Sequence, residues 1–115
     1  MIPRLHRFHG YNSLRGVYRT GRAARGPLFA VKAAPNARRR TYRVAVVVAR
    51  KVNKSAVARN RIRRRLYEAV RELESDINQP FDIVITVFSD SLLQAPYKVL
   101  KSQLKKQLKQ AGVLK

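Results

Sequence analysis

Apolar residues along the chain form short runs that are typical of strands and are separated by turn residues. Residues 27–34 alternate enough for a strand, residues 35–40 are predicted to form a basic turn, and residues 41–50 are rich in Val. A further buried strand is predicted over 81–88, after a turn around 78–80. Because residues 41–50 are apolar on both faces, we expect this segment to be a central strand covered on both sides.

Two segments nearer the chain ends have helical spacing instead. Ser13 can cap a first helix, and Gly21 is predicted to end it in the left-handed conformation. A last helix is predicted to begin at Pro96 and Tyr97 and to stop at Gly112. The residues that share one apolar face are Tyr11, Leu14, Val17 and Tyr18 in the first helix and Leu100, Leu104 and Leu108 in the last.

The longest predicted helix begins after Ser55, which offers an N-cap. Its apolar stripe covers about a third of the helical wheel and is expected to face the core. The stripe consists of Ala58, Ile62, Leu66, Ala69, Val70 and Leu73. The residues expected to avoid it are Arg59, Asn60, Arg63, Arg64, Tyr67 and Arg71, with Arg61 and Arg65 on a flank shared with Glu68 and Glu72.

The predicted order of elements is helix, two or three strands, helix, strand and helix. Such an order is typical of a two-layer α/β or α+β fold in which helices cover a small mixed sheet. A chain of 115 residues has room for about one domain around a single core. We therefore expect one domain over residues 1–115, with residues 1–10 as a flexible arm.

Charge narrows the possible partners. The formal net charge is +20, from 26 Lys and Arg residues against 6 Asp and Glu residues, and no acidic residue precedes Glu68. Such a chain attracts polyanions, because neutralising a polyanion releases its condensed counterions. The partner is therefore expected to be nucleic acid or an anionic membrane.

The longest helix concentrates much of this charge. Its arginines within seven positions are Arg59, Arg61, Arg63, Arg64 and Arg65. These like charges repel one another, and only Glu68 is placed to relieve them locally. Because a planar guanidinium matches phosphate oxygens with paired hydrogen bonds, we interpret the cluster as a nucleic-acid face. The face includes Asn60 and is expected to extend to Arg50, Lys51 and Lys54 before the helix.

Residue types that would let the protein itself hydrolyse a phosphodiester are scarce. That reaction needs a general acid and base, or clustered carboxylates that hold metal ions. The only histidines, His6 and His9, lie in a half of the chain that has no carboxylate to pair with them. The chain has no cysteine and no apolar run near the roughly 20 residues that span a bilayer. We expect a cytoplasmic, soluble protein that is not a nuclease by itself.

The segment "ARNRIRRRLYEAV" resembles the signature of the bacterial ribonuclease P protein subunit, in which an Arg-Asn-Arg triplet precedes a basic pair and a helix carrying Glu. Upstream, "VYRTGR" and "YRVAVVVARKVNKSAV" resemble the family's first helix and the strand that leads into the triplet. Downstream, "FDIVITV" and "YKVLKSQLKKQLKQAG" resemble its closing strand and helix. The resemblance covers about residues 4–112.

This resemblance implies both a fold and a role. The fold would be ribosomal-protein-like, with a left-handed β-α-β crossover through the arginine helix, although general packing rules favour the right-handed form. The chain would join a catalytic RNA that removes the 5′ leader of precursor tRNA. In that family the RNA performs the hydrolysis with a divalent metal such as Mg²⁺, so the protein alone would be inactive and would bind no cofactor.

The resemblance also assigns residues to two binding sites. The predicted contacts with the catalytic RNA are Arg50, Lys51, Lys54, Arg59, Asn60, Arg61, Arg63 and Arg64. The leader is predicted to lie in a groove formed by Leu14, Tyr18, Ala30 and Lys32. Leu14 and Lys32 stand where the family usually has aromatics, and Phe88 stands where it usually has Arg. Leader binding is therefore expected to depend more on charge than on stacking.

Two other functions fit the same composition. A structural RNA-binding protein of the ribosomal type shares the size, charge and fold class. A DNA-compacting protein is disfavoured, because arginines crowded at the start of one helix beside a sheet suit a folded RNA surface better. We expect no membrane or DNA partner. Whether the turn Arg38–Arg40 touches RNA stays open.

Overall fold

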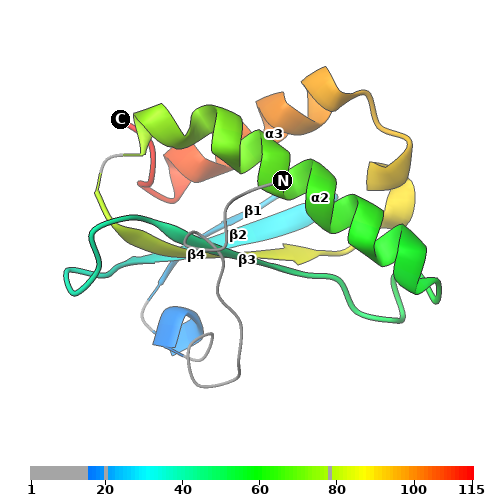
Figure 1. Ribbon diagram of the computed structural model, residues 1–115, viewed down its shortest axis with the longest axis horizontal. Coiled ribbons are helices and arrows are strands. Elements are labelled where there is room, and N and C mark those ends of the chain that lie inside the picture. Colours follow the sequence, from blue (N-terminus) through cyan, green and yellow to red (C-terminus); the bar gives the residue numbers. More distant parts are fainter. Residues whose placement is uncertain (1–15, 20, 78) are drawn as a thin grey trace.

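The computed structural model describes residues 16–19, 21–77 and 79–115, and Figure 1 shows its two layers. The strands are β1 (Arg22–Arg25), β2 (Phe29–Pro35), β3 (Arg43–Val47) and β4 (Phe81–Val87), in the order β1-β2-β4-β3. β3 and β4 are parallel, and the other neighbours are antiparallel. The helices α2 (Ala56–Leu73) and α3 (Tyr97–Gln110) cover one face of the sheet. The helical residues 16–19 lie on the opposite side. The predicted mixed α/β architecture is confirmed.

One expectation about the strands was wrong, and another was incomplete. Residues 41–50 contain β3, but this strand lies at the edge of the sheet and not in its centre. Both faces of this edge strand are apolar because both are covered. Val44 and Val46 join the core beneath α2, whereas Ala45 packs with Val17 and Val84 on the other side. The strand β1 was not predicted, because its sequence RAAR has little apolar signal and pairing with β2 defines it.

The main core fills the space between the helices and the sheet. α2 contacts β3, and α3 contacts β1 and β2, so together the two helices cover the sheet from edge to edge. Phe29, Ile83 and Leu104 are fully buried there. Burial of each such side chain stabilises the fold by about 1.5–3 kcal/mol.

The helix α2 follows most of the predicted pattern. The Ser55 side chain accepts a hydrogen bond from the Ala58 backbone N–H, which confirms the N-cap. The stripe is buried from Ile62 to Leu73, and Ala58 is half-buried. The outward placement of Tyr67 was wrong, because its ring joins the same core cluster and is only 8% exposed. The buried face of α2 is therefore wider than the apolar stripe alone.

Two glycines lie at ends of helical segments for different reasons. Gly112 has a φ of 80° and follows α3, where Val113 N–H donates to Leu108 O at 2.9 Å. This is a Schellman-type stop, as predicted. Gly21 was also predicted to adopt the left-handed conformation, but Gly112 is the only described residue with a positive φ. Gly21 is needed for space, since a Cβ there would lie 2.6 Å from Val17 O.

One buried amide joins α3 to the β1–β2 hairpin. The Gln107 side chain is 1% exposed, and its Nε2 donates to Ala24 O at 3.1 Å and to Phe29 O at 2.9 Å. Gly26, in the hairpin turn, allows this approach because a Cβ would lie 2.6 Å from Gln107 Oε1. The hairpin is therefore fixed to the helix layer by its backbone carbonyls as well as by apolar packing.

The parallel strands β3 and β4 are adjacent and are connected through α2. This is the β-α-β unit that the resemblance implies, and its left-handedness stays a prediction. The turn at residues 35–40 joins β2 to β3, as expected. No helix in the described part of the chain is long and apolar enough to cross a membrane.

Candidate RNA interface

The arginine face is the outward surface of the first half of α2 together with the connection that precedes it. Asn60, Arg61 and Arg64 are exposed on the helix. Arg50, Lys51 and Lys54 are exposed in the connection from β3. The structure therefore places these six predicted contacts on neighbouring parts of one surface. This surface combines the flexible side chains of Lys51 and Lys54 with the planar guanidinium groups of the arginines, which suit phosphate oxygens.

Arg59 has a different environment from the rest of the arginine face. It is half-buried, and its Nη1 donates to Asn53 O at 2.9 Å and to Lys54 O at 3.0 Å. The expectation that Arg59 avoids the buried stripe was wrong, because at 100° per residue it falls between Leu66 and Val70 on the wheel. Its charged head leaves the core by reaching back to the connection. Arg59 thus fixes the connection that forms part of the arginine face.

The other arginines of α2 also differ in the partners that their side chains contact. Arg63 Nη1 donates to Asn60 Oδ1 at 2.8 Å, which orders both side chains on the exposed surface. Arg65 donates to the carbonyls of Leu92 and Ala95, so it fixes the segment that leads into α3. Arg71 pairs with Glu68 one turn earlier on the same helix. Repulsion within the cluster is thus reduced at its edges, whereas Arg61 and Arg64 face solvent.

The second predicted site lies on the sheet face opposite α2 and α3, here called the open sheet face. The strand register forms rows of side chains across it. One row contains Ala45, Val84 and Lys32, and the next contains Val47, Thr86 and Ala30. Most of these side chains are small, so the face is shallow and leaves room for a ligand backbone.

The helical residues 16–19 cover part of the open sheet face. Tyr18 is 42% exposed, and Lys32 Nζ donates to Tyr18 O at 2.6 Å while lying 6.0 Å from the centre of its ring. Ala30 is half-buried one row away. The structure therefore brings Tyr18, Lys32 and Ala30 together, as the groove prediction requires. Leu14 lies outside the described residues.

One aromatic residue of the open sheet face was not recognised as a candidate site residue. Phe88 was expected to end a buried strand, but β4 ends at Val87, and Phe88 is 39% exposed. The Arg25 guanidinium lies 4.5 Å from the centre of its ring. The alternation of β4 contains the missing signal, since Phe88 has the same parity as Val84 and Thr86, which belong to the open sheet face.

At the other end of the open sheet face, three strands are joined by a polar network. Arg43 donates to Asp82 through Nε and Nη2, both at 2.8 Å, and Asn36 Nδ2 donates to Asp82 Oδ2 at 2.8 Å. Burial alone would raise the pKa of Asp82. The hydrogen bonds and the charge of Arg43 outweigh burial and lower that pKa below its ordinary value. Asp82 is therefore ionised at neutral pH and stabilises the sheet.

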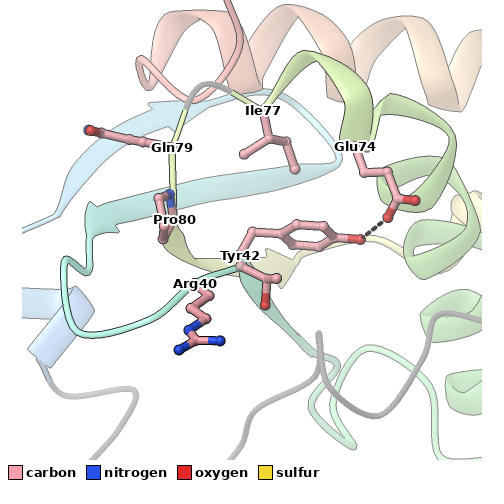
Figure 2. Close-up of a pocket in the computed structure, with 7 residues that line it drawn as sticks. Arg40, Tyr42, Glu74, Ile77, Gln79 and Pro80 are labelled. Atoms are coloured by element: carbon pink, nitrogen blue, oxygen red, sulfur yellow. Dashed lines mark hydrogen bonds between the residues drawn. The ribbon is translucent and has the colours of Figure 1, made fainter.

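A pocket of about 340 Å³ lies beside the basic turn, between the end of α2 and the start of β4. Figure 2 shows the Tyr42 ring reaching across to Glu74, with Arg40 turned away from that pair. Tyr42 Oη donates to Glu74 Oε2 at 2.7 Å. Burial and this hydrogen bond raise the pKa of Tyr42, so its hydroxyl remains a donor at neutral pH. The pair connects β3 to the end of α2. RNA contact by the turn stays a prediction.

Acidic residues of this chain are mostly engaged by neighbouring donors. Besides Glu68, Glu74 and Asp82, Glu72 accepts from Tyr97, and Asp90 accepts from Asn53 at 3.2 Å. Within residues 16–19, 21–77 and 79–115, no group of three or more His, Asp or Glu side chains is placed to hold a metal ion. His6 and His9 lie outside those residues.

The sequence matches known proteins over almost its whole length. A family model described as Ribonuclease P matches residues 2–112. A ribonuclease P protein component from Chloroflexus aurantiacus is 38% identical over 113 residues, which cover 98% of this chain and 82% of the relative. One from Roseiflexus castenholzii is 36% identical over 113 residues, covering 98% of this chain and 91% of the relative.

The fold also matches solved structures. The RNase P protein of Staphylococcus aureus superposes with a TM-score of 0.82 at 23% identity, covering 96% of this chain and 98% of that one. The RNase P protein of Thermotoga maritima superposes with a TM-score of 0.76 at 21% identity, covering 87% of this chain and 92% of that one. These likenesses show that the arrangement of the sheet and helices is that of known structures.

Proposed function

The chain belongs to the ribonuclease P protein family and is a subunit of a tRNA-processing ribonucleoprotein; from this premise we propose that it binds the catalytic RNA through the arginine face and the 5′ leader of precursor tRNA on the open sheet face. The product of the assembled enzyme would be tRNA with a mature 5′ end. The proposal locates this process in the cytoplasm and needs no membrane or DNA partner.

The observation that carries the proposal is that two unlike surfaces, one rich in arginine and one shallow, lie on the helix layer and on the opposite face of the sheet. The arginine face presents fixed guanidinium groups, which suit the phosphates of a folded RNA. The open sheet face is shallow, with Tyr18 and Lys32 at one side. Single-stranded RNA binds such surfaces through backbone charge and base stacking. One protein can therefore contact the catalytic RNA and the leader at once.

We assign the hydrolysis itself to the catalytic RNA with Mg²⁺. The carboxylates of this chain do not fit a Mg²⁺ site, since five of the six already accept hydrogen bonds from side chains of the protein. A Mg²⁺ site built by protein needs carboxylates that are free to coordinate the ion, usually together with substrate phosphates. The role of this chain is therefore to bind and position RNA.

The experiment that tests this function is recovery of RNA bound to the affinity-tagged chain in cells. We expect one major RNA that cleaves precursor tRNA when it is refolded with the chain. An Arg61→Ala/Arg64→Ala double variant should recover much less of it, whereas Lys105→Ala/Lys106→Ala on the exposed side of α3 should recover a normal amount. Recovery of ribosomal subunits would instead support the structural RNA-binding alternative, and recovery of genomic DNA would contradict an RNA partner.

A further inference from the structure

Phe88 is an exposed aromatic residue held in a fixed position. It is 39% exposed just after β4, and its backbone N–H donates to Leu28 O at 2.8 Å. Arg25 lies 4.5 Å from the ring centre, so one face of the ring is supported by a cation. A large aromatic exposed in this way lowers the stability of an isolated protein relative to a buried ring, but it offers a stacking surface to a ligand.

The ring borders a pocket of about 350 Å³ at the carboxyl ends of the parallel strands β3 and β4. Val47 and Thr86 are register partners on the open sheet face and belong to the pocket lining. The connection that leaves β3 contributes Ala49, Lys51 and Val52. The lining is mainly apolar, and it includes the aromatic ring of Phe88 and the ammonium group of Lys51. This chemistry suits a flat heterocycle attached to an anion.

Charge around the pocket favours a nucleotide over a peptide or an uncharged ring. Arg25, Arg50 and Lys51 are exposed on the segments beside it. The two acids closest to Phe88 in sequence do not reverse this positive charge: Asp90 accepts from Asn53, and Asp82 is paired with Arg43 at the opposite end of β4. Glu68 pairs with Arg71 on the helix layer. The pocket thus combines an aromatic surface with a positive rim, the two features that bind single-stranded nucleic acid.

The pocket lies at the end of the sheet face that also carries Lys32 and Tyr18. Lys32 is the register partner of Val84, and Phe88 lies four residues further along the same strand direction. At about 3.3 Å per residue, the two positions are about 13 Å apart. An extended RNA strand lying along β4 therefore reaches both.

We propose that the pocket beside Phe88 receives one base of the precursor-tRNA leader, stacked on the ring, with the neighbouring phosphates close to Arg25 and Lys51. This inference rests on the proposed function and deepens it, because it moves the main stacking contact from the first helix to the end of β4. Phe88 adds a second exposed aromatic ring to the sheet face that carries Tyr18. Purines stack more strongly than pyrimidines, so this position should favour a purine.

The test uses the assembled ribonucleoprotein and precursor tRNAs in which each leader nucleotide in turn is made abasic. With wild-type protein, making one leader position abasic should weaken precursor binding about 5- to 160-fold, the loss of one stacked base. Phe88→Ala should give a similar loss with the unmodified leader, and no further loss with that one abasic leader. Phe88→Tyr should restore binding. Val99→Ala, at a more exposed apolar residue on α3, should have no effect.

Three results would overturn the proposal. The first is unchanged precursor binding by Phe88→Ala, which would leave the pocket to another partner such as a protein. The second is an equal loss for precursor and mature tRNA, and the third is full additivity between Phe88→Ala and every abasic position. All three require that the wild-type assembly cleaves precursor tRNA. If the wild-type assembly itself does not cleave, the proposed function fails as well, so the two failures are distinguishable.

Discussion

Arginines on the same helix have different roles because their guanidinium groups reach different atoms. Arg59 bonds to the carbonyls of Asn53 and Lys54, and Arg65 bonds to those of Leu92 and Ala95. Arg64 is exposed to solvent. The first two residues stabilise the segments on either side of α2, whereas Arg64 is placed to contact RNA. Residue type alone therefore does not assign the role.

We predict that Arg64→Ala and Arg59→Ala separate binding from stability. Arg64→Ala should leave the free energy of unfolding within about 0.5 kcal/mol of wild type. It should lower the slope of log affinity against log salt for the catalytic RNA by about 0.7–0.9, the loss of one phosphate contact. Arg59→Ala should also destabilise the protein, by about 1 kcal/mol, because it loses two hydrogen bonds to carbonyls. Urea unfolding and a salt titration of RNA binding measure both effects. Equal stability of the two variants would contradict the assignment.

Asp82 provides a pH-dependent test at the same scale. Its folded-state pKa lies below the ordinary value of about 3.9, so its contribution to stability is present above that value and is lost as pH falls through the folded pKa. Asp82→Asn should lower the stability at pH 7 and should flatten the dependence of stability on pH below about 4. Unfolding by urea at several pH values checks this. A wild-type and variant pair with parallel pH profiles would show that Asp82 is not responsible.

At the scale of elements, contacts between helix and hairpin decide stability where the sequence pattern is weak. The β1 sequence RAAR offers little apolar area, and only Ala24 of this strand is buried. Gln107 compensates by donating to the carbonyls of Ala24 and Phe29. A buried amide that satisfies two backbone acceptors specifies the position of the hairpin under α3.

Gln107→Leu is therefore predicted to destabilise the protein although it adds apolar volume to the core. The two carbonyls lose their side-chain donor, and we expect a cost of about 2 kcal/mol in the free energy of unfolding. Gln110→Leu, the same change at the exposed last residue of α3, serves as the matched control and should be nearly neutral. Urea unfolding measures both. A neutral Gln107→Leu would mean that packing with the apolar side chain offsets the lost hydrogen bonds.

Helices and strand positions were predictable from the sequence to different extents for physical reasons. The caps of α2 and α3 are local, so Ser55 and Gly112 could be assigned from neighbouring residues. Strand neighbours depend on distant segments, which is why β1 was missed and β3 was placed in the centre of the sheet. Tyr67 was misplaced because the width of a helix's buried face depends on what lies beneath it. The parity of Phe88 was readable, but its exposure depended on where β4 ends.

On the scale of the whole molecule, the net charge of +20 makes the isolated protein repel itself and attract a polyanion such as RNA. The arginines of α2 and the open sheet face lie on opposite sides of the sheet, and Lys51 lies where the two surfaces approach each other, so one RNA can occupy each side. The site around α2 was predictable from composition, because arginine density is a local property of the sequence. The leader site was predictable mainly through the family resemblance, because residues 16–19, β2 and β4 meet only in the folded structure.

Cleavage of precursor tRNA by the reconstituted enzyme at low Mg²⁺ tests the central claim most directly. The assay compares purified protein, catalytic RNA and the two together, with a substrate labelled in the leader. We predict no cleavage by the protein alone, weak cleavage by the RNA alone, and a single efficient cut by the complex that leaves a 5′-phosphate on the mature tRNA. Metal-dependent cleavage by the RNA-free protein, or no gain when the protein joins the RNA, would contradict the account.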